Sequence, residues 1–206
     1  PAHVRERHAM YLKAAQRADG GFAGRMGDSD LYYTSFALRG LAILEELDEE
    51  TTQKAAGFLR GNMQSQQSIV DFFSLIYSSA LLYALCGVEV FTGVDENWDQ
   101  NVADFLNSLR REDGGFAKGR EGHAGSTYHT FLVLLVMQLI GQDIQEPERI
   151  VEFLHNQKAE GGGFREIRAA RRAGTNPTAA AIATLKILDR LDPATVDETM
   201  EFLLDK

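Results

Sequence analysis

Residues 110–140 read RREDGGFAKGREGHAGSTYHTFLVLLVMQLI, a Gly-Gly-Phe loop followed by a long apolar run. The same loop occurs at Gly20–Phe22, Gly114–Phe116 and Gly162–Phe164. The three phenylalanines are 94 and 48 residues apart, which is twice and once a period near 47. A fixed period of this size is typical of repeat architectures.

An aromatic-Leu pair marks every period, including the one that lacks Gly-Gly-Phe. Successive pairs are 47, 47, 48 and 49 residues apart, so five copies of one unit are indicated. The second copy has GNMQSQQSIVD at 61–71 in place of Gly-Gly-Phe, which predicts a different loop there. The aromatic-Leu pairs begin at Tyr11, Phe58, Phe105, Phe153 and Phe202.

Two helical patterns alternate within each period. The first is amphipathic, with apolar residues three and four apart, and predicts outer helices that are wet on one face. The second is apolar or small nearly all round and predicts buried inner helices. The outer patterns span 3–16, 51–63, 95–110, 146–157 and 193–204, and the inner patterns span 30–47, 70–85, 126–140 and 175–191.

These patterns predict an all-α fold of five outer and four inner helices, with almost no strand. Asp95, Glu146-Pro147 and Asp192-Pro193 indicate starts of outer helices, since acidic residues and proline favour the first turn. Equivalent positions in the repeat should pack alike between the layers. This prediction concerns Phe58, Phe105 and Phe153.

The composition limits the classes of function. With 206 residues and 44% hydrophobic, we expect one domain, 1–206. A net charge of −9 argues against a general nucleic-acid role or an anionic-membrane role. Cys86 is the only cysteine, which excludes an intrachain disulfide and a Cys-rich zinc site, and a cytoplasmic location is expected. No apolar run is expected to reach the roughly 18 residues of a membrane span.

The loop and helix-start motifs resemble the repeat of protein prenyltransferase β subunits and of squalene and other class II terpenoid cyclases. The resemblance implies an α/α-toroid-like array of helical hairpins, with four pairs and a final outer helix. Family members usually have more pairs, so an incomplete or truncated toroid is one interpretation. The motifs are Gln16-x-x-Asp19-Gly-Gly-Phe22-x-Gly24-Arg25, Asp113-Gly-Gly-Phe116, Gln157-x-x-x-Gly-Gly-Gly-Phe164 and Tyr128-His129-Thr130.

The resemblance implies that His129 occupies the place of a zinc-binding histidine. The family's zinc site also needs Asp-x-Cys, where this chain has Asp71-Phe72-Phe73. Without the thiolate we expect no cofactor, with zinc bound weakly or not at all. Asp71 and His129 would then form a depleted metal site or an acid/base site. A helix-start histidine that only contacts its neighbours is the alternative.

Class II cyclases protonate an alkene with an aspartic acid in Asp-x-Asp-Asp. The nearest text here is Asp28-Ser29-Asp30-Leu31, which lacks the final aspartate. Asp28 or Asp30 is therefore a candidate general acid. The alternative is that these carboxylates cap a helix.

Basic residues gather in two loops that precede inner helices. Because helix N-termini are electropositive, we expect a diphosphate or another anion to bind there. Arg25 matches a family arginine that contacts diphosphate, although Asp28 stands where the family has a second cation. The alternative is a solvated surface that balances Glu121, Glu160 and Glu166. The candidate diphosphate-binding residues are Arg25, Lys118, Arg120, Arg165, Arg168, Arg171 and Arg172.

Aromatic residues cluster at the starts of three inner helices. They could line a cavity for a polyprenyl chain, or be packed core. Thr178–Ala181, at the start of the fourth inner helix, is small by comparison and leaves space for a ligand or for close packing. The candidate isoprenoid-binding residues are Tyr32, Tyr33, Phe36, Phe72, Phe73, Tyr77, Tyr128 and Phe131.

The leading hypothesis is a prenyltransferase-like protein that binds an isoprenoid diphosphate, or another apolar anion, and transfers or cyclises it. A class II terpene cyclase-like enzyme or fragment is one alternative. A non-enzymatic helical-repeat scaffold is the other, with a protein partner or a second copy bound across an open toroid.

Overall fold

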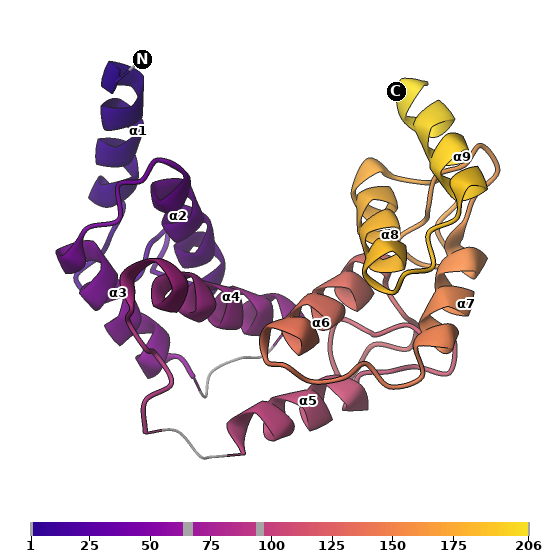
Figure 1. The fold of residues 1–206 in the computed structure, drawn as a ribbon, viewed down its shortest axis with the longest axis horizontal. Helices are drawn as coiled ribbons and strands as arrows, with labels where there is room; N and C mark the ends of the chain where they lie inside the picture. Colours follow the sequence, from indigo (N-terminus) through magenta and orange to yellow (C-terminus); the bar gives the residue numbers. More distant parts are fainter. Residues whose placement is uncertain (1, 64–67, 94–96, 206) are drawn as a thin grey trace. The chain divides into compact units, whose positions relative to one another are not determined.

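The computed structural model describes residues 2–63, 68–93 and 97–205, and in these ranges the chain alternates outer and inner α-helices (Figure 1). Extended residues in these ranges pair only in isolated bridges such as that between Gln16 and Phe22. Within these described ranges the prediction of five outer helices, four inner helices and almost no strand is confirmed. The outer helices are α1 (Ala2–Ala14), α3 (Glu49–Gly61), α5 (Trp98–Ser108), α7 (Pro147–Gln157) and α9 (Pro193–Leu204). The inner helices are α2 (Leu31–Ile43), α4 (Ile69–Cys86), α6 (Thr127–Leu139) and α8 (Thr175–Ile187).

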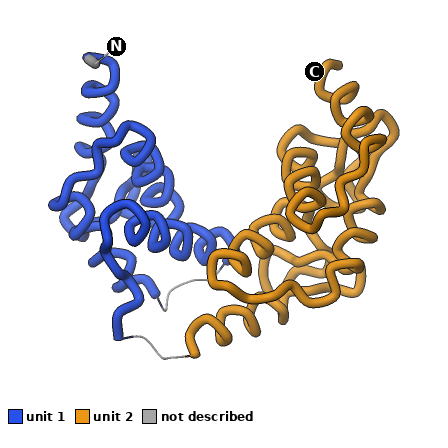
Figure 2. The backbone as a smooth tube through the Cα atoms, viewed as in Figure 1, with its two compact units in different colours: residues 1–96 blue, residues 97–206 orange. Residues whose placement is uncertain are grey.

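The chain divides into two compact units, residues 1–96 and 97–206 (Figure 2). In unit 1 the inner helices α2 and α4 pack side by side, with α1 against α2 and α3 against α4. In unit 2 the inner helices α6 and α8 pack side by side, with α7 against α6 and α9 against α8. Each unit thus has a pair of neighbouring inner helices, but the outer helix packs against the inner helix that follows it in unit 1 and against the one that precedes it in unit 2. A single domain 1–206 stays a prediction.

Short polar residues begin several helices, as the sequence indicates. Asp192 accepts a hydrogen bond from the backbone N–H of Thr195 at 2.9 Å, and Asp48 caps α3 in the same way. Glu146 stands before Pro147 in the left-handed conformation and makes no side-chain cap. Asp95 lies outside the described residues. Of the three predicted helix starts, Asp192 therefore has a side-chain hydrogen bond behind it.

The Gly-Gly-Phe motif anchors each loop to the inner helix that follows it. Its phenylalanine is buried in all three copies. Its backbone N–H donates to the hydroxyl of a threonine on that helix, at 2.9 Å in each copy. These buried N–H groups would otherwise lack a partner, so the threonine stabilises the loop. The pairs are Phe22 with Thr34, Phe116 with Thr130, and Phe164 with Thr178.

The first glycine of the motif lets the loop touch the next outer helix. Gly114 has φ +91°, and a Cβ placed on it would lie 2.3 Å from the carbonyl oxygen of Arg149 in α7. Gly162 has φ +87°, and its Cβ would lie 2.1 Å from the carbonyl oxygen of Glu198 in α9. Only glycine fits such a conformation and such a contact. The motif is thus a structural clasp that joins one repeat to the next.

The second glycine receives the aromatic ring of the aromatic-Leu pair. A Cβ on Gly115 would lie 2.6 Å from the ring of Phe153, which is buried, and Gly21 meets Phe58 in the same way. Phe105 is only half-buried, so the prediction that it packs equivalently is wrong. The preceding repeat lacks Gly-Gly-Phe and offers it no glycine pair. The divergent loop at 61–71 includes residues 64–67, which lie outside the described residues.

Helix α4 is long and apolar enough to cross a membrane by length and composition alone, with 18 residues and a mean hydropathy of 1.8. The expectation that no apolar run reaches that length is therefore wrong. In this structure 39% of the helix is buried, and it packs against α2 and α3. Core helices of globular proteins meet the same criterion.

Candidate functional site

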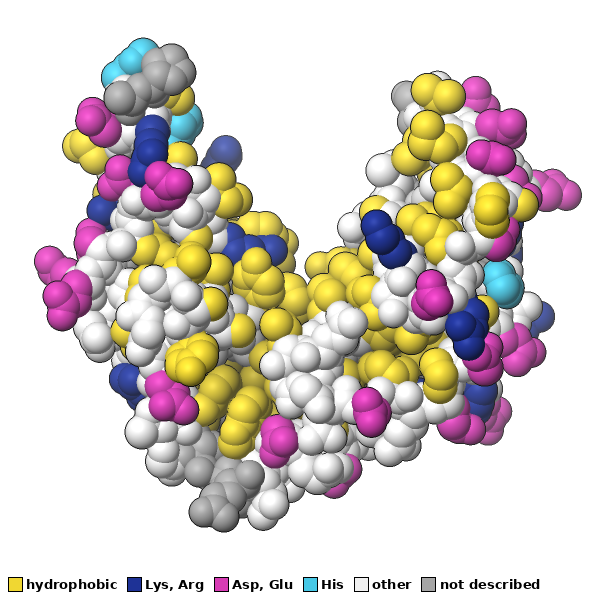
Figure 3. Space-filling view, in the orientation of Figure 1, with side chains coloured by type: hydrophobic (Ala, Val, Ile, Leu, Met, Phe, Trp, Pro, Cys, Tyr) yellow, Lys and Arg dark blue, Asp and Glu magenta, His cyan; other side chains and the backbone are white. Residues whose placement is uncertain are grey.

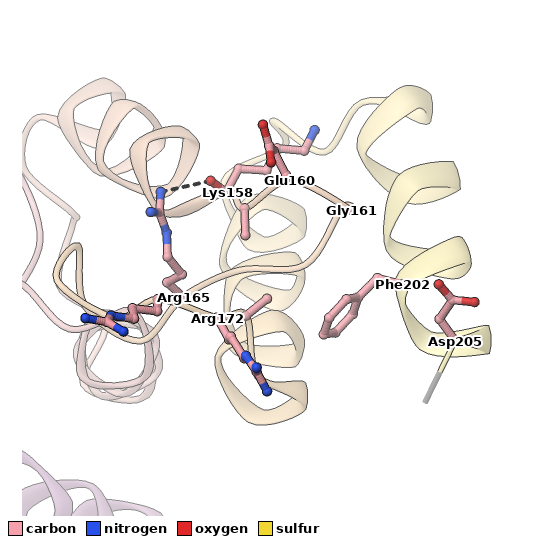
Figure 4. A pocket seen from close by; sticks show the side chains of 10 residues that line it. Lys158, Glu160, Gly161, Arg165, Arg172, Phe202 and Asp205 are labelled. Carbon is pink, nitrogen blue, oxygen red and sulfur yellow. Dashed lines mark hydrogen bonds between the residues drawn. The ribbon is translucent and has the colours of Figure 1, made fainter.

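The basic residues before α8 do not act as one group. Arg165 directs its guanidinium to the end of α7, where it donates to the carbonyls of Asn156, Gln157 and Lys158 at 3.0, 3.2 and 3.0 Å. A helix C-terminus leaves such carbonyls without partners, so Arg165 caps α7. Figure 4 shows this turn toward Lys158. The guanidinium of Arg165 therefore has a structural role at the end of α7.

Arg171 and Arg172 are exposed and line a cleft of about 620 Å³ between the loop before α8 and the end of α9 (Figure 4). The cleft also contains Glu160 and Asp205, which reduce its positive charge. Helix α8 begins at Gly174 with no side-chain cap, so its first N–H groups add positive potential near these arginines. This arrangement can bind an anion.

Arg120 and Arg168 line a second cleft, of about 670 Å³, formed by the two loops before α6 and α8. The same cleft holds Arg111, whose guanidinium donates to the carbonyls of Gly119 and Gly122 at 3.0 and 2.6 Å and so shapes the loop. Glu112 and Asp113 also line it. The structure thus brings together two of the predicted cations here and three others, Arg165 included, at the first cleft.

The N-terminus of α6 already holds a carboxylate. The backbone N–H of Thr127 donates to the carbonyl of Glu166 at 2.9 Å, and the N–H of Tyr128 donates to Oε1 of Glu166 at 3.3 Å. Glu166 comes from the loop before α8 and fills the position that a diphosphate oxygen would take. Glu166 therefore already interacts with this helix N-terminus, and the expected binding of an external anion there stays a prediction. Lys118, in the preceding loop, is exposed.

In unit 1, Arg25 and Asp28 are exposed. Asp30, also exposed, accepts a hydrogen bond from the backbone N–H of Tyr33 at 2.6 Å and caps α2. The capping interpretation of Asp30 therefore has a hydrogen bond behind it.

The aromatic residues at the starts of α2 and α4 are not packed into the core. Tyr32, Tyr33 and Phe36 are 41%, 45% and 50% exposed, although they belong to an inner helix. The rings of Tyr32 and Phe36 meet edge to face, with centroids 4.8 Å apart. On α4 the rings of Phe73 and Tyr77 are half-buried and lie 5.4 Å apart. We call this surface the aromatic face. It consists of Tyr32, Tyr33, Phe36 and Arg39 on α2 and of Phe73 and Tyr77 on α4.

Arg39 joins the two helices of the aromatic face. Its guanidinium lies 4.2 Å from the ring centroid of Phe36 and 5.2 Å from that of Tyr77. Its Nε donates to the carbonyl of Ser35 at 3.3 Å. The sequence hypothesis missed Arg39. The signal that could have found it is a cation in an otherwise apolar helix, three residues after Phe36 on the same stripe.

The remaining aromatic candidates are also partly accessible. Phe72 on α4, and Tyr128 and Phe131 on α6, are half-buried. On α8 the small residues Ala180 and Ala181 are buried while Ala179 is exposed, so both close packing and open surface occur there. None of the eight aromatic candidates belongs to the buried core, which argues against the packed-core interpretation.

His129 lies at the start of α6, half-buried, beside Ser126. Its Nδ1 is 2.6 Å from the hydroxyl of Ser126, which also bonds to the carboxylate of Glu166. Burial lowers the pKa of His129 below its ordinary value, opposed by the charge of Glu166 and assisted by that of Lys118. The ring is therefore neutral near pH 7.

Each candidate zinc ligand has a hydrogen-bond partner of its own. Asp71 is engaged by Ser68, whose hydroxyl donates to it at 2.8 Å, and Phe73 stands where the thiolate would be. Nδ1 of His129 is engaged by Ser126. Among the described residues no group of three His, Cys, Asp or Glu side chains is placed to bind a metal. The weak binding of zinc stays a prediction.

Comparison with known proteins identifies the repeat. The family model of the prenyltransferase alpha-alpha toroid domain matches residues 2–60 and 51–206. No match was found among curated proteins.

Proposed function

The chain belongs to the prenyltransferase alpha-alpha toroid domain family, and from this premise we propose that it binds an isoprenoid diphosphate. The apolar tail lies on the aromatic face of α2 and α4. The diphosphate is held by arginine side chains, of which Arg39 lies in the same face. Transfer or cyclisation of the bound group would use the same binding chemistry.

One observation carries the proposal: large aromatic side chains remain exposed on a helix that is otherwise core. Apolar rings gathered at a surface indicate a binding site, because water contact with them is unfavourable. Ring faces also stabilise the positive charge that develops when a prenyl diphosphate ionises. Arg39, stacked within the same face, adds a cation close to the rings.

Three arginine groups are candidates for the diphosphate. Arg39 is in unit 1, within the aromatic face. The other two groups are in unit 2, where Arg171 and Arg172 line the cleft at the end of α9 and Arg120 and Arg168 line the other cleft, and each is tested by itself as an anion site. Each charge-assisted contact contributes about 1.5–3 kcal/mol. Replacing the arginines of each group by glutamine in turn shows which group binds the diphosphate. Only the replacement of that group should weaken binding of the prenyl diphosphate while leaving binding of the matching prenyl alcohol unchanged.

The test of the tail site compares two exposed aromatic positions in unit 1. Farnesyl and geranylgeranyl diphosphate are titrated into the parent, into the double variant Tyr32→Ala, Phe36→Ala, and into Tyr11→Ala as control. Tyr11 is 71% exposed on α1, away from α2's aromatic stripe. The double variant should bind at least tenfold more weakly, and the control should bind as the parent does. Equal binding by all three would remove the aromatic face from the site.

The class II cyclase alternative gains no support from Asp28 and Asp30, which are exposed. The scaffold alternative has one observation in its favour. Leu203 of α9 is 44% exposed, whereas its equivalents Leu59 and Leu154 are fully buried, and Met200 is 55% exposed beside it. Hydrophobic side chains over α8 and α9 are visible in Figure 3. Sedimentation of the parent and of Met200→Glu tests whether a second copy covers this stripe, since association would be lost in the variant.

A further inference from the structure

Arg39 is a half-buried cation that has no carboxylate partner among the residues that the structure describes. It is the only basic residue in α2 and α4. Lys13, the other half-buried cation in the described part of unit 1, pairs with Asp48 at 2.7 Å. Charges that are partly removed from water are commonly paired. Arg39 therefore has a position open to an anion from outside the chain.

The guanidinium of Arg39 keeps hydrogen-bond donors that the protein does not use. Its Nε–H donates to the carbonyl of Ser35 at 3.3 Å. The ring centroids of Phe36 and Tyr77, at 4.2 and 5.2 Å, offset part of the charge but supply no oxygen acceptor. Within the described ranges the N–H groups on Nη1 and Nη2 have no hydrogen-bond acceptor. Such a fork binds both oxygens of a carboxylate.

The cation lies between apolar groups along one stripe of α2. Tyr32 and Phe36 precede Arg39 by seven and three residues, and Ile43, which is 82% exposed, follows it by four. Residues at these spacings share one face of a helix. The helix axis rises about 10 Å from Tyr32 to Arg39, at roughly 1.5 Å per residue. An apolar chain on this stripe can therefore cover the rings while its acid group contacts Arg39.

The charges of the two helices favour a head group with one negative charge. The acidic residues at their starts are Asp30, which caps α2, and Asp71 in the first turn of α4. Both oppose the additional negative charges of a diphosphate. A carboxylate carries a single charge, which one guanidinium matches without further cations.

We infer that the aromatic face binds an apolar carboxylic acid, with the carboxylate on Nη1 and Nη2 of Arg39 and the chain along α2. The inference rests on the proposed function for the place of the tail, and it adds a second class of ligand to that site. The chain is of the isoprenoid kind, with a carboxylate in place of the diphosphate. Every residue that the inference needs belongs to unit 1.

Farnesoic acid and its methyl ester form a matched pair of probes, because they share the chain and differ by one negative charge. At pH 7 the acid is ionised. In calorimetric titrations the parent should bind the acid about tenfold or more tightly than the ester, since the ester loses the charge-assisted contact. Equal affinities, or a tighter ester, would overturn the inference. This comparison needs no variant.

Arg39→Gln tests whether that residue holds the carboxylate. Glutamine can still donate to the carbonyl of Ser35 but carries no charge. The variant should bind the acid no more tightly than the ester. Arg7→Gln, which removes an exposed cation of α1, is the control and should keep the preference of the parent. A preference that survives in Arg39→Gln would also overturn the inference, and the parent comparison decides by itself if this variant does not fold.

The two proposals fail separately. If farnesoic acid binds through Arg39 but farnesyl diphosphate does not bind, the proposed function fails and the carboxylate site stands. If farnesyl diphosphate binds while the acid and the ester bind equally, the inference fails and the proposed function stands.

Discussion

The close contact between Gly162 and α9 leads to a prediction that compares two neighbouring glycines. Gly161 and Gly162 have nearly the same backbone conformation, with φ +88° and +87°. A Cβ on Gly161 would meet nothing within 4 Å, whereas a Cβ on Gly162 would lie 2.1 Å from the carbonyl oxygen of Glu198. Alanine at either position suffers the same local strain, and only Gly162→Ala also pushes the loop away from α9.

The strain of an L-residue in the left-handed region costs about 1–2 kcal/mol, and both variants carry it. Removing the overlap at Gly162 requires a shift of roughly 1 Å between the loop and α9, since Cβ contacts below 3.0 Å do not persist. Such overpacking costs a further 1–3 kcal/mol, roughly. For a chain of this length each kcal/mol lowers the melting temperature by about 2–4 °C.

Thermal unfolding followed by circular dichroism measures the difference. With about 2 kcal/mol for the overlap, Gly162→Ala should melt about 4–8 °C below Gly161→Ala. Equal melting temperatures for the two variants would refute the view that this glycine is required by contact with α9.

Three further predictions follow from named contacts. Asp48 caps α3, and a hydrogen bond from Lys13 lowers the pKa of its carboxyl to about 2. The ionised carboxylate therefore stabilises the fold above pH 4, and this stabilisation is lost as the pH falls toward 2. In urea unfolding at pH 7, Asp48→Ala should lower the free energy of unfolding by about 1 kcal/mol, and Asp48→Asn, which can still cap, should lower it clearly less. Arg165→Ala should lower the melting temperature, because three carbonyls at the end of α7 lose their donor, while Arg171→Ala should leave it unchanged; the opposite order would contradict the division of roles. Purified protein should contain well under one equivalent of zinc by elemental analysis, and a tight equivalent lost in His129→Ala would contradict the prediction.

The repeat and its helices could be predicted because their signals are local. Apolar residues at helical spacing and a recurring aromatic-Leu pair need no knowledge of distant contacts. The threonine whose hydroxyl accepts each buried phenylalanine N–H could also have been predicted, because it recurs at nearly the same spacing. It follows Phe22 by 12 residues, and Phe116 and Phe164 by 14.

Which charged residues stabilise the fold and which are available to a ligand could not be predicted in the same way. Whether an arginine in a loop binds a ligand or caps a helix depends on where its side chain turns, and Arg165 turns back to α7. Glu166 reaches the start of α6 across 40 residues of sequence. The sequence shows the charge of such residues but not their partners. For this reason the seven basic candidates separate into structural and available groups only in the folded chain.

A crystal structure of the protein with farnesyl diphosphate tests the central claim most directly. The account predicts the prenyl chain against the rings of Tyr32, Phe36 and Tyr77, where exposed aromatic side chains gather on α2 and α4. A prenyl chain bound elsewhere, with these three rings still in contact with water, would contradict it.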